Sequence, residues 1–512
     1  MLRDHTRNVG KELTDKLLTM EIIGHMFGDA TPNSIVLWIG VKANNDNYSW
    51  STKISFSCKK PSRELWHGFA ENEIPKIKEL NGGYGAILKP FVLYDDGNNE
   101  YNYELTITSK EMVGGNQDGG KKYFKGGKFK TPAKAGEKRD FSVLVSSCQK
   151  ARNKKGLKTG HGTDPKQPAW KRINDELGNI DMNIMLGDTH YRDDINREKK
   201  WEATEAQFGI NEYRKFLRNT ITYAIYDDHD FISNDQYGAT KDNGTAPPGK
   251  LLSKRQRAAY YFKELWPIPN FPIKEPKDGT YYKVTYGIVD FYFLDCFYYR
   301  DNVQNISFLG SEKNIVNTTT KIRNEQWNWL KDEFGKYKKE SSSVKHNVKV
   351  LCCGNTLITG GANWIDCKAD YEQLQNLLNG ISNVLYLSGD VHLLKHNFHA
   401  TNDKYYSAGR ELRSAGFNVL NKNGGNGLNE IISSGIGRVQ RTDRTEPSQA
   451  WTENTSEKIR CSSLVAAPGG FVKMYFFPEG KNEVIITFHR GKGMKYQPRN
   501  FTYELITDAD EP

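Results

Sequence analysis

The chain has 512 residues, of which 37% are hydrophobic and 26% are charged, and its formal net charge is +10. This length exceeds the size at which a single hydrophobic core keeps growing, so we expect two or more domains. The composition is globular and excludes a mostly disordered chain. The sequence has no apolar run long enough for a transmembrane segment.

The excess positive charge gathers between Lys121 and Lys158. Such a run is usually a solvated surface, and the alternative is a binding site for a polyanion. The seven cysteines include no CxxC pair, which argues against a structural zinc module. The first residues carry mixed charge and show no apolar core of a signal peptide.

Short apolar or alternating runs separated by turn residues predict β-strands in the first hundred residues. These runs cover residues 35–39, 50–58, 86–94 and 101–108. The pattern is typical of a small β-sandwich, which we assign to residues 1–112. Residues 113–139 are rich in Gly and Lys and predict a linker.

From residue 140 the pattern changes to apolar strands that alternate with helical segments. The predicted strands cover residues 141–145, 183–186, 222–226, 290–294, 348–351 and 383–387, with a helix over 324–336 and a closing hairpin over 471–488. Strands alternating with helices predict an α/β domain over residues 140–512. Ligands in such domains gather at the carboxyl ends of the strands.

Four of these strand ends carry side chains that can bind metals or transfer protons. They read Ser146-Ser-Cys-Gln149, Gly187-Asp-Thr-His-Tyr191, Asp227-Asp-His-Asp230 and Gly389-Asp-Val-His392. Each alone is an ordinary polar strand end, but so many acidic groups at one sheet edge indicate metal ligands. Thiolate is a soft ligand, carboxylate and phenolate are hard, and imidazole suits transition metals. The mixture predicts a transition ion beside a harder ion, with Asp188 placed to bridge them.

In this order the four blocks resemble the alkaline phosphatase D family, a branch of the calcineurin-like metallophosphoesterases. The segment Gly28–Trp38 is similar to that family's N-terminal signature, and segments 294–300, 325–330 and 431–435 resemble further family segments. The resemblance implies a four-layer αββα metallophosphoesterase domain preceded by a small N-terminal β-sandwich. It also implies a secreted or periplasmic location.

Carried over residue by residue, the resemblance implies a dinuclear or multinuclear centre. An iron(III) ion would be bound by Cys148, Asp188, Tyr191 and a residue of the Asp390–His392 block. A second ion, calcium(II) or another divalent metal, would share Asp188 and the same block.

Two assignments stay open in the sequence. The remaining ligand of the second ion is either Asp228 or Asn234. The side chain of His229 matches the histidine that faces the substrate in the wider superfamily. From the sequence it has three possible roles: protonating the leaving group, binding a metal, or making a structural hydrogen bond.

The activity implied is hydrolysis of a phosphate ester by a hydroxide that the metals activate. Phosphomonoesters and phosphodiesters both fit, including polyanionic substrates such as nucleic acid, teichoic acid or phospholipid. A second hypothesis is a protein without catalytic activity that binds a polyanion through residues 121–158. The presence of a full ligand set argues against this second hypothesis.

Overall fold

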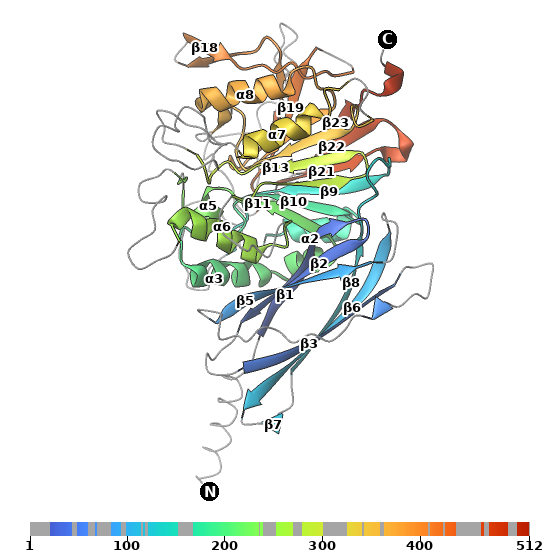
Figure 1. The fold of residues 1–512 in the computed structure, drawn as a ribbon, viewed down its shortest axis with the longest axis vertical. Coiled ribbons are helices and arrows are strands. Elements are labelled where there is room, and N and C mark those ends of the chain that lie inside the picture. Colours follow the sequence, from blue (N-terminus) through green and yellow to red (C-terminus); the bar gives the residue numbers. More distant parts are fainter. Residues whose placement is uncertain are drawn as a thin grey trace.

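A computed structural model gives the fold of the chain. It describes residues 21–42, 49–59, 67–68, 83–93, 99–113, 116–117, 121–151, 167–234, 236–238, 252–269, 279–300, 325–339, 343–358, 363–407, 410–422, 425–436, 462–464, 470–489 and 499–510. Of the basic stretch between Lys121 and Lys158, residues 152–158 lie outside the described residues. The described part is a mixed α/β fold with several sheets and few helices (Figure 1).

One large sheet brings together strands from both ends of the chain. In spatial order it contains β23 (Arg499–Glu504), β22 (Glu483–His489), β21 (Phe471–Phe476), β9 (Phe141–Ser146), β10 (Met182–Leu186), β11 (Ile221–Ile225), β1 (Glu21–Thr31), β2 (Ser34–Lys42) and β5 (Tyr84–Val92). The central strands β9, β10 and β11 are parallel. Their carboxyl ends therefore lie along one edge of the sheet.

A second large sheet contains the later strands of the α/β pattern. Its order is β12 (Tyr282–Tyr286), β13 (Val289–Phe293), β14 (Val348–Cys352), β15 (Val384–Ser388), β19 (Gly427–Ser433), β16 (Leu394–Ala400) and β20 (Ser462–Leu464). Strands β13, β14, β15 and β19 are parallel neighbours. Away from the two large sheets, β17 (Lys404–Ser407) pairs with β18 (Arg410–Ser414).

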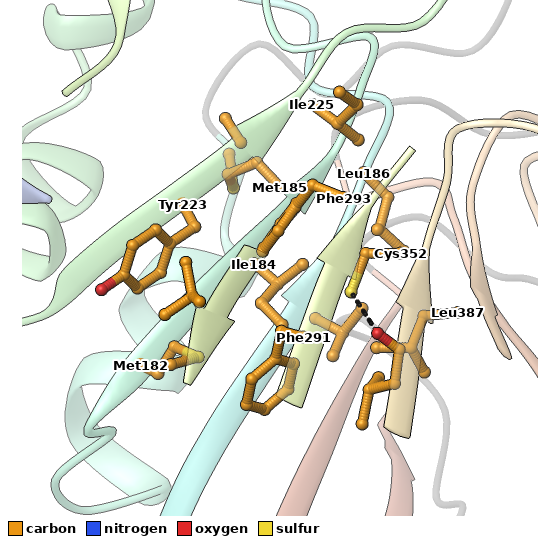
Figure 2. Packing of buried hydrophobic residues seen from close by; sticks show 14 of the residues in the cluster. Met182, Ile184, Met185, Leu186, Tyr223, Ile225, Phe291, Phe293, Cys352 and Leu387 are labelled. Atoms are coloured by element: carbon orange, nitrogen blue, oxygen red, sulfur yellow. Dashed lines mark hydrogen bonds between the residues drawn. The ribbon is translucent and has the colours of Figure 1, made fainter. Parts of the chain in front are cut away.

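The main core lies between the two large sheets. Strands β9, β10, β11, β13, β14 and β15 are buried along their whole length, as expected for parallel strands covered on both faces. Figure 2 shows side chains of both sheets interleaved there, such as Ile184 and Phe291. The ring of Phe141 stacks between Tyr286 at 3.9 Å and Phe476 at 4.7 Å, measured between ring centroids.

The helices pack on the sheets through aromatic side chains. They are α2 (Ala169–Glu176), α3 (Arg197–Phe208), α4 (Asn211–Leu217), α5 (Asp228–Phe231), α6 (Lys254–Leu265), α7 (Glu325–Gly335) and α8 (Lys368–Leu378), with short 3-10 turns at Trp364–Asp366, Pro478–Gly480 and Asp508–Asp510. Trp201 of α3 stacks on Trp38 of β2. Phe334 of α7 contacts Tyr292 of β13. No described helix is long and apolar enough to cross a membrane.

A smaller sheet extends toward the bottom of the view in Figure 1. It contains β3 (Ser49–Lys59), β4 (His67–Gly68), β6 (Glu100–Val113), β7 (Asn116–Gln117) and β8 (Lys121–Lys130). The imidazole of His25, on β1, is hydrogen-bonded to the hydroxyls of Tyr103 on β6 and Tyr123 on β8, at 2.8 and 3.0 Å. These contacts join the smaller sheet to the nine-stranded sheet.

The residues predicted as a linker include strand β8, which pairs with β6 from Lys121 to Lys130. The high Gly and Lys content of this segment made the strand hard to predict. Its side chain Phe129 is nevertheless buried and stacks on Tyr101. Two lysines of the predicted basic surface lie near acids, Lys128 by Glu100 and Lys130 by Asp181.

The strands predicted from the sequence are confirmed as β2, β3, β5, β6, β9, β10, β11, β13, β14 and β15, and the closing hairpin as β21 and β22. The helix predicted over 324–336 is confirmed as α7. The N-terminal strands divide between two sheets, because β1 pairs in parallel with β11. The separate N-terminal sandwich, the boundaries at 112 and 139 and the four-layer order stay predictions.

Replacing Phe141 should test how far stability depends on the contact between the large sheets. The ring is 1% exposed, so Phe141→Ala removes a fully buried aromatic side chain and should lower the free energy of unfolding by about 3–5 kcal/mol. Urea unfolding followed by circular dichroism measures this loss. The matched control is Val92→Ala, because Val92 is 61% exposed and its loss should be near zero. Equal, small losses in both variants would contradict this description of the core.

Candidate metal centre

The ends of the parallel strands bring the predicted ligands together. Among the described residues, three groups have ligand atoms that all lie within 4.8 Å of one another. They are Cys148, Asp188 and His392; Asp188, Asp228 and His229; and Asp188, Asp227, Asp228 and Asp390. Asp188 belongs to all three groups. The bridging role that the sequence predicted for Asp188 stays a prediction.

The backbone is unusual at these same residues. Cys148, Asp188, Tyr191, Asp390 and His392 all have positive φ values, from 45° to 62°. Side chains other than Gly rarely adopt this left-handed conformation, and it occurs preferentially at functional sites. Here it occurs where each chain segment leaves its strand and turns sharply. The turns direct five side chains of different types toward one place.

When they are ionised, the acidic groups of this cluster repel one another unless cations lie between them. Burial, followed by the charges of nearby acids, raises the pKa of both Asp188 and Asp227 well above the usual value. Both carboxylate oxygens of Asp227 and one of Asp188 are buried and make no hydrogen bond of normal geometry with the described residues. Buried carboxylates without partners are costly. This donor set therefore fits cations bound between the carboxylates.

A further buried side chain without a hydrogen-bond partner among the described residues is that of Asn355. It follows β14, two residues after Cys353 and next to Gly354. A Cβ atom on Gly354 would lie 2.8 Å from the carboxylate carbon of Asp227, so the backbone there packs directly on that acid. The backbone just before Asn355 therefore lies beside the acidic cluster.

The thiol of Cys148 lies on one side of Asp188. Its Sγ is 3.6 Å from Oδ2 of Asp188 and 3.0 Å from the hydroxyl of Ser434, which follows β19. Burial raises the pKa of the Cys148 thiol to about 11, despite hydrogen bonds that lower it. Nearby, the Tyr191 hydroxyl lies 2.7 Å from Nε2 of His392. Thiol, phenol and imidazole thus surround one side of the cluster.

His229 lies beside Tyr191, and its orientation is set by Asp193. Nδ1 of His229 lies 2.5 Å from Oδ1 of Asp193, and the ring lies 4.3 Å from that of Tyr191, between centroids. Burial alone would raise the pKa of Asp193, but the hydrogen bond from His229 lowers it below the usual value. An imidazole that donates from Nδ1 has Nε2 as its remaining basic nitrogen.

Buried polar contacts fix the turn that carries His229. The backbone N–H of Thr189 donates to the carboxylate of Asp230, at 2.8 Å, which joins the ends of β10 and β11. From α3, the buried ammonium of Lys200 donates to the carbonyl oxygens of His229 and Asp230, at 3.0 and 2.6 Å. These bonds satisfy carbonyls at the end of the short helix α5.

The sequence predicted part of this arrangement. The structure brings together Cys148, Asp188, Tyr191, Asp228, His229, Asp390 and His392. Asn234 lies past α5 and is exposed. Asp227 and Asp193 were not among the site residues predicted from the sequence. Asp227 stands beside Asp228 at a strand end, a signal that was available, whereas nothing in the sequence pairs Asp193 with His229.

Comparison with known proteins agrees with this geometry. The family model described as PhoD-like phosphatase matches residues 143–457. This range contains all four ligand blocks and more than half of the chain. The fold and the site thus define a metal-dependent phosphatase. The chain belongs to the PhoD-like phosphatase family, as its resemblance to alkaline phosphatase D implied.

Two solved structures share the fold. A structure of PhoD is 17% identical, with a TM-score of 0.63, over 94% of this chain and 90% of that chain. A purple acid phosphatase, PPD1 from seeds of yellow lupin (Lupinus luteus), is 12% identical, with a TM-score of 0.55, over 94% of this chain and 74% of that chain. At these identities the likeness shows the fold alone. Comparison with curated proteins gives no match.

The raised pKa values predict how stability depends on pH. Above the ordinary pKa of 3.8, the unfolded chain has released protons that folded Asp188 and Asp227 still hold. The free energy of unfolding of metal-stripped protein should therefore fall as pH rises from about 3.8 through the folded-state pKa values. Bound cations compete with these protons, so metal-loaded protein should show a smaller fall.

The measurement is urea unfolding of both forms from pH 4 to about 8. The difference between the two curves isolates the cluster, because other acids contribute equally to both forms. Asp227→Asn removes one charge and should reduce the fall in the metal-stripped form. Parallel curves for the two forms would show that the carboxylates do not bind metal.

Proposed function

We propose that the protein hydrolyses phosphate esters at a dinuclear centre built on Asp188. In this proposal Cys148, Tyr191 and His392 bind one ion with Asp188. The second ion is bound by Asp188 with Asp227, Asp228 and Asp390. The observation that carries the proposal is that oxygens of four carboxylates lie within 4.8 Å of one another. In two of these carboxylates, Asp188 and Asp227, buried oxygens make no hydrogen bond of normal geometry with the described residues.

The donor types suggest which ions are bound. Thiol, phenol and imidazole on the first side suit a transition ion, and we propose iron(III). The carboxylates on the second side are hard oxygen donors, and we propose calcium(II) or another divalent ion. Two such ions, held close together by these residues, would clamp a phosphoryl group, activate water and neutralise the charge that develops on oxygen.

The chain itself supplies proton transfer and orientation. The contact with Asp193 orients the imidazole of His229. His229 can then give a proton to the leaving oxygen, which is the role that this proposal assigns to it. His229 also has a ring nitrogen within 4.8 Å of ligand atoms of Asp188 and Asp228, so a ligand role is the alternative to test.

A cation beside this site favours an anionic substrate. The ammonium of Lys150 lies 5.2 Å from the ring centroid of Tyr191, directly after the strand end that carries Cys148. A positive charge there attracts a phosphate ester to the edge of the site. Either a monoester or a diester fits these residues, and the basic residues of 121–158 suit a polyanionic diester.

The proposed iron site should give the protein a visible colour. Thiolate or phenolate bound to iron(III) absorbs visible light, so Cys148→Ala and Tyr191→Phe should each change or remove the absorption band and lower the iron content. Absorption spectra and elemental analysis of protein purified without chelator measure both effects. A matched control is Cys367→Ser, because Cys367 is buried at the start of α8 and belongs to none of the three groups of ligand atoms. A colourless, fully active protein without iron would contradict the iron assignment.

The function is tested by turnover of metal-loaded protein and of His229→Ala. Wild-type protein should hydrolyse monoesters or diesters in a metal-dependent way. If His229 protonates the leaving oxygen, His229→Ala should keep its metals and lose about 10²–10⁴-fold in rate on alkyl esters. The loss should be much smaller on nitrophenyl esters, whose leaving group needs no proton. Asp193→Asn should show the same selectivity with a smaller loss.

Other outcomes separate the alternatives. Metal loss in His229→Ala would indicate a ligand. Equal losses on both kinds of ester in a metal-replete variant would exclude the leaving-group role. No turnover of any phosphate ester by metal-loaded wild-type protein, with steeply salt-dependent binding of a polyanion, would contradict the proposed function and favour the polyanion-binding hypothesis.

A further inference from the structure

Two buried thiols lie against each other outside the proposed ligand set. Cys296 follows β13 and Cys353 follows β14, and both are free cysteines in the structure. Their Sγ atoms are 2.9 Å apart, which is closer than two sulfur atoms normally approach without a bond. Both side chains are almost completely buried, at 1% and 0% exposure. Burial alone would place these thiols in a core, but it would not bring their sulfur atoms so close.

The strand geometry explains this closeness. Strands β13 and β14 are parallel neighbours with Phe293 opposite Cys352. The pairing continues past the strand ends, where the N–H of Leu294 donates to the carbonyl of Cys352 at 2.9 Å. The two thiols therefore project from adjacent segments that hydrogen bonds already hold together. Closing a bond between them needs little movement of the backbone.

The neighbouring thiol of Cys352 points elsewhere. Successive side chains along a strand project from opposite faces of a sheet. Figure 2 shows Cys352 among Leu186 and Leu387, in the core between the large sheets, with its sulfur directed at the carbonyl oxygen of Val350, 3.9 Å away. Cys352 thus lies on the opposite face from Cys353. The close contact with Cys296 is therefore made by Cys353 and not by Cys352.

We propose that Cys296 and Cys353 are a modification site, a dithiol that small peroxides oxidise to an intramolecular disulfide. One thiol reacts with hydrogen peroxide to give a sulfenic acid and one water. The second thiol then displaces the hydroxyl group, which leaves as a second water when the S–S bond forms. Both S–H bonds break, peroxide is reduced and two electrons leave the sulfur pair. Because both thiols are buried, the oxidant must be small.

The cross-link would join strand ends that support the acidic cluster. Gly354, next to Cys353, packs on the carboxylate of Asp227. The two cysteines are 57 positions apart, so a bond between them closes a long loop and restricts the unfolded chain. We therefore expect the oxidised protein to have the higher melting temperature, by about 5 °C. This inference does not depend on the proposed catalytic mechanism.

The test treats reduced, metal-loaded wild-type protein with a small excess of hydrogen peroxide. The protein is then denatured in iodoacetamide without reductant, digested and analysed by mass spectrometry. We expect one cross-linked peptide pair containing Cys296 and Cys353, lighter by two hydrogens than its parts, which dithiothreitol separates. Cys352→Ser and Cys367→Ser should keep this pair, and Cys296→Ser should lose it together with the rise in melting temperature.

Two results would overturn the inference. One is alkylation of both Cys296 and Cys353 after peroxide treatment, which would show that the thiols stay reduced. The other is a link from Cys353 to Cys352 or to any cysteine besides Cys296. Failure of this test would leave turnover of phosphate esters unchanged, so it is distinguishable from failure of the proposed function.

Discussion

The repulsion among four carboxylates, carried by strand ends of both large sheets, is the constraint on which this structure depends. Oxygens of Asp188, Asp227, Asp228 and Asp390 lie within 4.8 Å of one another. At this separation two unit charges repel by roughly 3 kcal/mol at an effective dielectric constant of about 20. Only protons or cations relieve a repulsion of this size, and at neutral pH the donor set suits cations.

The rest of the fold keeps these groups in place against that repulsion. Two large sheets pack face to face, so the strands that end at the cluster are rigid and buried. The sharp turns after the strands require left-handed backbone at residues such as Asp188 and Asp390. Such strain persists only when surrounding structure determines it strongly. The hydrogen bonds that Lys200 donates and that the carboxylate of Asp230 accepts give this support around His229.

The sequence predicted the strands of the α/β core and most of the cluster, because each ligand block directly follows a continuous apolar run. It could not predict contacts between distant segments. His229 and Asp193 are joined only by the fold, and so are Cys296 and Cys353. At β8 the Gly and Lys content predicted a linker, whereas the segment forms a strand with the buried ring of Phe129. The sequence of strand β1 shows no alternation of polar and apolar residues. Its pairing with β11 joins segments that lie far apart in the sequence.

The number of metal ions per chain tests the central claim most directly. Native mass spectrometry of protein purified without chelator counts bound ions in the folded chain, and the mass after denaturation provides the metal-free reference. A dinuclear centre on Asp188 predicts at least two ions in the folded wild-type protein and fewer in Asp188→Ala. A folded, active protein that binds no ion, or an unchanged count in Asp188→Ala, would contradict this view of the site.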